Sequence, residues 1–323
     1  MKMVKFKAND AGRWISRQRL IGIIVLLLVI YLVLPQQAVF GHSIHVLAGA
    51  KLPLVLMAGL DVATTYFVAA ITYWLLAFKT LIYGRTVLVE LASAFINRLL
   101  PSGIGGMSVN YAYLRSNGHS KAQAVAVIAV NNSLGLAGHL LLLALAFLLM
   151  LNTHGLSFNF RLSLGKWLIT LLAVVFLLAV LSLSRRLAEA FRHFELGVVH
   201  NILFYKRRPS RLLLALCSSL GLTMLNIFSL WLCSRALNFN ISLVDVIFVL
   251  TLGIGVGVVT PTPGGLIGVE AGLVAGLVAI GLTSSQALAI ALLFRLLTFW
   301  LPLLAGGVAF VVLRSKKILG SYI

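Results

Sequence analysis

The sequence predicts an all-α integral membrane protein, and three observations lead to that prediction. Hydrophobic residues make up 61% of the 323 residues and charged residues only 10%, with a mean hydropathy of +1.06, whereas soluble domains carry about 25% charged residues. Apolar runs close to the roughly 20 residues that a helix needs to cross a bilayer recur along the chain. Lys and Arg gather mainly between these runs. We therefore predict a single polytopic membrane domain over residues 1–323.

Six apolar runs are predicted to cross the membrane as full helices. The basic segment 1–19 precedes the first run, and no clear A-x-A cleavage site follows it, which indicates an uncleaved helix with a cytoplasmic N-terminus. In the basic loop 184–211, apolar residues recur at helical spacing, so that an amphipathic helix on the cytoplasmic leaflet and an ordinary connecting helix both fit. The predicted crossings are residues 20–34, 52–78, 122–151, 167–183, 212–233 and 284–313.

The charge of the chain is strongly positive, with a formal net charge of +19 from 26 basic and 7 acidic side chains. Such a balance ordinarily suggests a nucleic-acid partner. Twenty of the 26 Lys and Arg, however, fall in the segments predicted to be cytoplasmic, as the positive-inside rule requires. We therefore expect no nucleic-acid partner, and we place both termini in the cytoplasm.

Two segments broken by Pro and Gly are predicted to be re-entrant helical hairpins. Residues 87–100 reach only about 21 Å at 1.5 Å per residue, which is short of the roughly 30 Å hydrocarbon core. They are followed by P-S-G-I-G-G (101–106), and residues 243–281 are broken in a similar way at T-P-T-P-G-G (260–265). We expect the first hairpin to enter from the cytoplasm and the second from outside.

The two hairpins resemble each other in sequence, which predicts an inverted repeat of residues 80–151 and 243–313. Residues 101–106 and 263–268 both fit P-x-G-x-x-G, and S-K-A-Q-A (120–124) matches T-S-S-Q-A (283–287) at a predicted helix start. Paired Pro/Gly-interrupted segments of this kind mark the substrate site of many transporters. The predicted substrate-binding backbone positions are Pro101, Gly103, Gly105, Gly106, Pro263, Gly264, Gly265 and Gly268.

Five ionisable residues lie at membrane depth in this topology: Asp61, Glu90, Arg98, Glu270 and Arg295. Placing one charged side chain at the centre of a bilayer costs about 3 kcal/mol on insertion scales, so these residues must be paired, protonated or hydrated. Arginine next to a helix N-terminus binds phosphate well, so we predict a polar cavity for an anionic head group. Pairing of each arginine with a carboxylate, preferably Glu270, fits equally well. Asp61 fits an interhelical hydrogen bond as well as a functional role.

Further polar and small residues have simpler interpretations. Asn131 and Asn132 share a helix face with His139, and helix–helix hydrogen bonding is the favoured interpretation, with substrate contact as the alternative. Gly268 begins a G-x-x-x-G ladder with Gly272 and Gly276 that predicts close helix packing. The seven histidines are scattered without a ligand set, so we expect no metal and no cofactor.

The broken segments also carry a resemblance to a known family. L-P-S-G-I-G-G (100–106) with Y-A-Y-L-R (111–115), and P-G-G-L-I-G-V-E (263–270) with F-R-L-L (294–297), are similar to the two signatures of the lysylphosphatidylglycerol synthase transmembrane-region (flippase-like) family. The resemblance implies a bacterial or archaeal inner-membrane protein that moves phospholipid or a related lipid between leaflets. It also implies functional roles for Glu270 and Arg295, which match the family's acidic and basic positions.

The first half departs from the family pattern. Met107 and Asn110 stand where relatives often have an acidic residue and an arginine, and Asn132 stands where an arginine is common. The family's usual substrate therefore does not carry over. Only ten residues follow Leu313, which leaves no room for the soluble aminoacyl-transfer domain of the larger relatives. We accordingly expect a chain that is not an enzyme.

The leading functional hypothesis is a lipid flippase that takes a membrane phospholipid with an anionic head group. The alternatives are a membrane-embedded lipid-modifying enzyme and a non-transporting partner of such an enzyme. A second copy of this chain and a lipid-synthesising enzyme are the further partners that we consider.

Overall fold

The computed structural model describes residues 37–100, 104–154, 204–205, 208–260 and 263–320, and the regular structure in these ranges is helical. Four of the described helices are long and apolar enough to cross a membrane. They are α3 (Leu52–Leu76), the Lys121–Leu142 part of α6 (Lys121–His154), α9 (Pro209–Ala236), and the segment Ser284–Ser315. These helices confirm the prediction of an all-α, multi-pass membrane protein.

The other two predicted crossings, residues 20–34 and 167–183, lie outside the described residues. So do the basic segment 1–19 and most of the loop 184–211. A helix that was not predicted, α2 (Gln37–Ala48), packs against α12 (Ser284–Arg295), where the Ser43 hydroxyl donates to the carbonyl of Ser285 at 3.0 Å.

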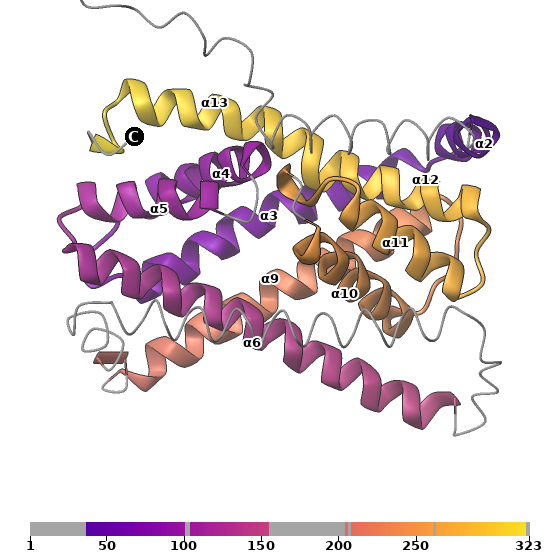
Figure 1. Ribbon diagram of the computed structural model, residues 1–323, viewed down its shortest axis with the longest axis horizontal. Coiled ribbons are helices and arrows are strands. Elements are labelled where there is room, and N and C mark those ends of the chain that lie inside the picture. Colours follow the sequence, from indigo (N-terminus) through magenta and orange to yellow (C-terminus); the bar gives the residue numbers. More distant parts are fainter. Residues whose placement is uncertain (1–36, 101–103, 155–203, 206–207, 261–262, 321–323) are drawn as a thin grey trace, which may run out of the picture.

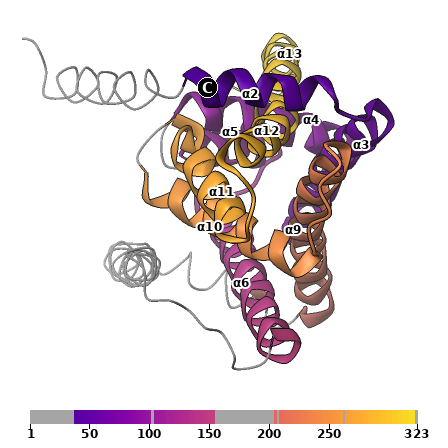
Figure 2. The ribbon, with the colours of Figure 1, turned by 90° about the vertical axis from the view of Figure 1, so that its right-hand side faces the viewer.

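Each Pro/Gly-broken segment forms a pair of short antiparallel helices. The first pair is α4 (Tyr83–Leu99) and α5 (Ile104–Ser116); the second is α10 (Leu243–Val259) and α11 (Gly268–Ala279), joined through a 3-10 turn at Pro263–Gly265. In Figure 1 the two pairs enter the molecule from opposite ends, and their tips meet near its middle. The helices α3 and α9 pack side by side; they cross the middle of the view in Figure 1 and lie along the right-hand side in Figure 2.

The turns that follow the two helix pairs have the same construction. Gly118 and Gly281 end α5 and α11 with φ of 80° and 105°, and in both turns the next amide bonds back five residues to the helix. Ser120 and Thr283 then begin α6 and α12, each exchanging hydrogen bonds with the Gln three residues later. These reciprocal bonds are capping boxes. They confirm the predicted similarity of the two helix starts.

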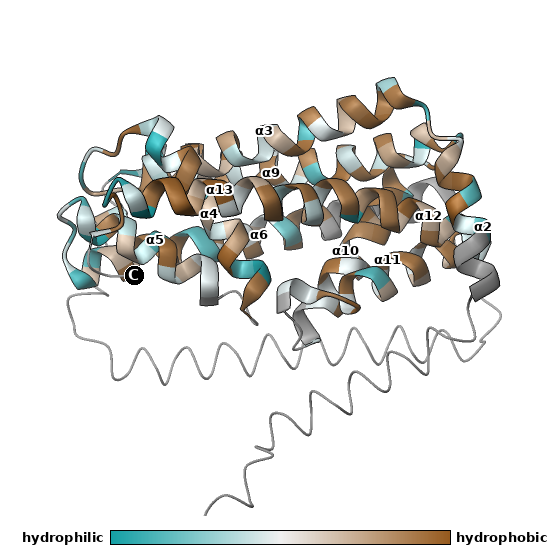
Figure 3. Cartoon of the chain, turned by 90° about the horizontal axis from the view of Figure 1, so that it is seen from above, coloured by the Kyte–Doolittle hydropathy of each residue, from teal (hydrophilic) through white to brown (hydrophobic). Residues whose placement is uncertain are grey.

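The apolar surface of the bundle follows from the composition of its helices. Figure 3 colours each residue by its hydropathy. Hydrophobic residues cover most of the length of the helices, and hydrophilic residues gather mainly towards the ends of the molecule. Large side chains such as Leu304, Val308 and Val311 on α13 (Leu301–Ser315) are about two-thirds exposed. Such a surface suits lipid rather than water.

The glycine ladder of α11 packs closely against α10, as predicted. A Cβ added at Gly272 would lie 2.8 Å from the Cα of Gly253, and one at Gly276 would lie 3.1 Å from the Cα of Val249. These contacts involve backbone atoms, which cannot turn away. The second helix pair therefore depends on the absence of side chains along its seam.

The side chain of His119 ties the first pair to the preceding loop. It is 1% exposed; its Nε2 accepts from the backbone N–H of Lys79 at 3.2 Å, and its Nδ1 lies 3.0 Å from the carbonyl of Leu114. An accepting Nε2 requires the neutral ring with its proton on Nδ1. Burial accordingly lowers the pKa of His119.

We expect Gly272→Ala to lower the melting temperature of the purified protein in detergent. Overpacking of this kind costs about 1–3 kcal/mol. Gly135→Ala on α6 is the matched control, because no described atom lies within 4 Å of its added Cβ, and it should leave the melting temperature unchanged or raise it. Equal melting temperatures for the two variants would contradict the close seam between α10 and α11.

We expect acid to destabilise the protein partly through His119. Because its pKa in the folded state is lowered, its contribution to stability is complete above the unfolded pKa of about 6.5 and is lost as the pH falls below it. The melting temperature of His119→Gln should therefore fall less between about pH 8 and about pH 5 than that of the wild type. His42→Gln, an exposed position in α2, is the control and should keep the wild-type pH dependence.

Candidate functional site

A polar cavity of about 460 Å³ lies between the first helix pair and the helices α3, α6 and α9. One residue of the π-helical turn Leu296–Trp300, which joins α12 to α13, also reaches it. Twelve of its 18 lining residues have polar side chains, although the helices around it are largely apolar. These residues are Thr65, Tyr66, Tyr73, Glu90, Ser93, Asn97, Arg98, Asn110, Asn131, Asn132, Asn226 and Thr298.

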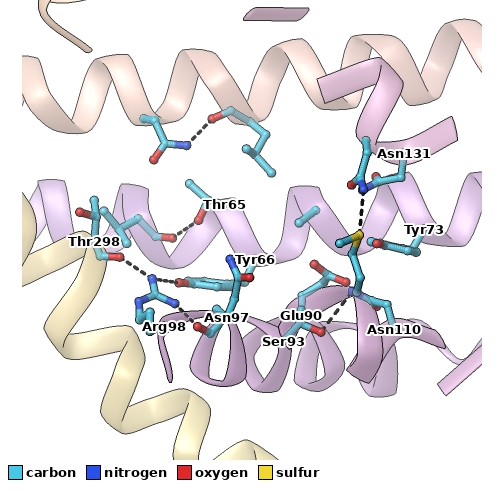
Figure 4. A pocket seen from close by; sticks show the side chains of 18 residues that line it. Thr65, Tyr66, Tyr73, Glu90, Ser93, Asn97, Arg98, Asn110, Asn131 and Thr298 are labelled. Carbon is cyan, nitrogen blue, oxygen red and sulfur yellow. Dashed lines mark hydrogen bonds between the residues drawn. The ribbon is translucent and has the colours of Figure 1, made fainter. Parts of the chain in front are cut away.

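The first helix pair supplies five of the twelve polar lining residues, including both charged ones. Glu90, Ser93 and Asn97 recur every three or four residues and so lie on one face of α4. On the facing helix α5, the Asn110 amide donates to the Ser93 hydroxyl at 3.1 Å, and its side chain faces the carboxyl of Glu90 (Figure 4). The pair thus presents amide, hydroxyl and charged groups to the cavity, beside Ala94 and Met107.

The three positions that depart from the family pattern all line this cavity. Met107 and Asn110 lie on α5, and Asn132 on α6 donates to the thioether sulfur of Met107 at 3.4 Å. Substitutions that are scattered in the sequence are therefore neighbours in space, and together they determine the chemistry of the wall.

Several buried atoms of the wall have no hydrogen-bond partner among the described residues. They are Oε1 of Glu90, Oδ1 of Asn97, Oδ1 of Asn110 and Nε of Arg98. Buried polar atoms are nearly always satisfied by protein or water. The side chains that carry these buried atoms line the cavity, where water or a bound molecule can satisfy them.

Arg98 is held at the tip of the first pair by three oxygen atoms. Its Nη1 donates to the carbonyl of Ala94 at 2.6 Å, and its Nη2 donates to the carbonyl of Thr298 at 2.5 Å and to the Tyr66 hydroxyl at 3.4 Å. No carboxylate pairs with it among the residues that the structure describes. Its positive charge at the cavity is therefore not neutralised by an ion pair there.

The Thr298 carbonyl, which accepts from Arg98, lies four residues before Pro302. A helix would use the N–H of residue 302 to satisfy the carbonyl of residue 298, and proline has no N–H. The chain adopts the π-helical turn just before this proline. The guanidinium of the first repeat unit thus satisfies a carbonyl of the second.

Glu270 and Arg295 form an ion pair with each other. Arg295 Nε donates to Glu270 Oε1 at 2.6 Å, and Arg295 is only 8% exposed. The Phe299 ring lies beside this pair, with its centroid 4.5 Å from the Arg295 guanidinium carbon and 5.4 Å from that of Arg98. Neither Glu270 nor Arg295 lines the cavity, so the structure brings them to its neighbourhood and not into its wall.

The predicted glycine positions lie at the two tips. A Cβ at Gly264, which has φ of 60°, would lie 3.1 Å from the Cα of Arg98 and 2.6 Å from the Phe299 ring, so the two tips are in contact. A Cβ at Gly105 would lie 2.5 Å from the Ile96 carbonyl oxygen, which explains how α5 crosses α4 closely. Of this set, Gly106 lines the cavity.

The other predicted Pro and Gly positions lie along the second tip or outside the residues that the structure describes. Gly265 and Gly268 pack against Gly257 of α10. Pro263 begins the 3-10 turn. Pro101 and Gly103 lie outside the described residues.

Asp61 and the α6 asparagines differ in their relation to the cavity. The Ser229 hydroxyl donates to Asp61 Oδ2 at 2.5 Å, which joins α3 to α9, and Asp61 does not line the cavity. Its interhelical role is the one that the structure shows. Asn131 and Asn132 line the cavity, and His139 does not.

The sequence analysis missed several polar lining residues, among them Tyr66, Asn97, Asn226 and Thr298. A signal was present for Asn97, because Glu90, Ser93 and Asn97 have the spacing of one helix face. No local signal marks Asn226 or Thr298, which reach the cavity only through packing of the second half against the first.

The sequence was compared with those of known proteins. The sequence model of the family described as "Lysylphosphatidylglycerol synthase TM region" matches residues 19–306. The chain belongs to this family. It is also similar to a UPF0104 membrane protein of Pyrococcus horikoshii, with 24% identity over 318 residues that cover 85% of this chain and 93% of the relative. In this member of the lysylphosphatidylglycerol synthase transmembrane-region family, the match includes both helix pairs and the cavity between the helices.

We expect the ion pair between Glu270 and Arg295 to stabilise the fold mainly by avoiding an unpaired buried charge. Glu270→Gln and Arg295→Gln should each cost about 3–5 kcal/mol, because each leaves one charge without its partner. The double variant Glu270→Leu/Arg295→Leu should lose less than the sum of the single losses. Thermal unfolding in detergent measures all three, and single losses that add in the double variant would contradict the coupling.

Proposed function

We propose that this protein translocates a phospholipid or a related anionic lipid between the leaflets of a bacterial or archaeal inner membrane. The observation that carries the proposal is the polar cavity within a bundle of apolar helices. A lipid that crosses a bilayer needs a polar environment for its head group while its tails stay in hydrocarbon. Ionisable side chains in such a place, here Glu90 and Arg98, are expensive and are typical of a substrate path.

A re-entrant arrangement of the two helix pairs supports this function. The helices α4, α5 and α11 have 17, 13 and 12 residues, which correspond to about 26, 20 and 18 Å, less than the roughly 30 Å hydrocarbon core. We infer that each pair enters and leaves the membrane on one side, the first pair from the cytoplasm and the second from outside. With residues 20–34 and 167–183 as further crossings, this topology has six full spans and places both termini in the cytoplasm by the positive-inside rule.

We propose that the lipid phosphate binds where the tips of the two helix pairs meet. Helices α5 and α11 begin at the tips, and helix N-termini carry a partial positive charge that favours phosphate. Arg98 adds a full positive charge that no described carboxylate pairs with. The head-group phosphate would bind there, and a rocking motion of the two repeat units about the contact of Gly264 with Arg98 would expose it to the other leaflet. This mechanism is transport and involves no chemical change in the lipid.

We expect the purified protein in proteoliposomes to accelerate the movement of dye-labelled phosphatidylglycerol between leaflets. Arg98→Gln and Glu90→Gln should each slow this movement about tenfold or more, because each removes a charged group from the cavity. Val308→Ala, on the exposed face of α13, is the control and should behave as the wild type. Equal lipid movement with and without the wild-type protein, across phosphatidylglycerol, phosphatidylethanolamine and phosphatidic acid, would exclude the proposal.

A further inference from the structure

We propose that the cavity selects a head group rich in hydroxyl groups, such as a sugar or polyol joined to the lipid through one phosphate. This inference rests on the proposed function, because it takes the cavity to be the lipid site. The unpartnered atoms of the wall and the distances between them indicate this kind of head group.

The unpartnered atoms of the wall are mostly hydrogen-bond acceptors. Oε1 of Glu90, Oδ1 of Asn97 and Oδ1 of Asn110 are buried and have no donor among the described residues. A bare phosphate ester presents acceptors and cannot satisfy other acceptors. The molecule that completes this wall must therefore bring several donors.

The positions of these acceptors favour hydroxyl groups over a single ammonium group. Glu90 and Asn97 are seven residues apart on α4, which is about 10 Å along the helix. An ammonium group is a compact point charge, so it can donate hydrogen bonds near Glu90 or near Asn97 but not at both places. The hydroxyl groups of a sugar or polyol are distributed over a ring or chain, and each can both donate and accept.

The composition of the wall fits the same head group. Five of the lining residues are asparagines, from α4, α5, α6 and α9. An amide side chain donates and accepts at neighbouring atoms, as adjacent hydroxyl groups do. A cavity that binds a positively charged amine through ion pairs would have several carboxylates in its wall. Glu90 is the one acidic residue in the lining.

The phosphate position is determined by the other end of the cavity. Arg98 is the one basic residue in the lining, and it lies eight residues from Glu90 on the same helix, about 12 Å away along the axis. A phosphodiester near Arg98 lies beside Asn97 and places the rest of the head group towards Asn110 and Glu90. One positive charge matches one phosphodiester.

The test is binding of short-chain lipids that share the phosphate and differ in the rest of the head group. The wild-type protein in detergent is titrated by native mass spectrometry with the dioctanoyl forms of phosphatidylinositol, phosphatidylglycerol, phosphatidic acid and phosphatidylethanolamine. We expect phosphatidylinositol to bind about tenfold more tightly than phosphatidic acid, with phosphatidylglycerol between them. Equal affinities for phosphatidylinositol and phosphatidic acid, or a preference for phosphatidylethanolamine, would overturn the proposal.

Variants locate the selectivity in the cavity. Asn97→Leu and Asn110→Leu should bring the preference for phosphatidylinositol over phosphatidic acid below about threefold. Arg98→Gln should weaken all four phosphate lipids alike, and Val308→Ala should change none. If both asparagine variants fold, as judged by their circular dichroism, and keep the wild-type preference, the proposal fails.

The binding test separates this inference from the proposed function. Selective binding of phosphatidylinositol without any lipid movement in proteoliposomes would support the head-group assignment and exclude translocation. Equal binding and equal movement of all four lipids would support translocation and overturn the head-group assignment.

Discussion

The hydrogen bond from Arg98 to the carbonyl of Thr298 joins the two halves of this protein at their centre. Pro302 has no N–H to donate to that carbonyl, as the residue four positions on in a regular helix would. The bond joins a side chain of the first helix pair to the backbone of the second half of the chain. Gly264 contacts Arg98 and Phe299 at the same place, and Arg98 lies on the wall of the cavity.

The two helix pairs are followed by turns and helix starts of the same construction and differ in how their charges are used. In the second unit, Glu270 and Arg295 neutralise each other. In the first unit, Glu90 and Arg98 lie about two helical turns apart and face the cavity without an ion-pair partner among the described residues. A repeated scaffold can thus contain one half whose charges stabilise structure and one half whose charges remain available. This difference is why we place the binding chemistry in the first half.

The departures from the family pattern become interpretable once they are seen in space. Met107, Asn110 and Asn132, at which the resemblance to the family predicts departures, all line one cavity. Two of them are asparagines, which together with Asn97, Asn131 and Asn226 give the wall amide groups that can both donate and accept hydrogen bonds.

The sequence by itself determined the features that depend on local rules. The four described crossings, the paired Pro/Gly breaks, the capping boxes after Ser120 and Thr283, and the glycine ladder of α11 all follow from apolar length, backbone freedom and short-range hydrogen bonding. Only the tertiary structure decided which charges pair and which polar side chains share a cavity. Glu270 pairs with Arg295, Asp61 bonds to Ser229, and Asn226 and Thr298 reach the wall from helices remote in the chain. Such partners are set by helix packing, whose distances and angles are not encoded in the spacing of residues along any one helix.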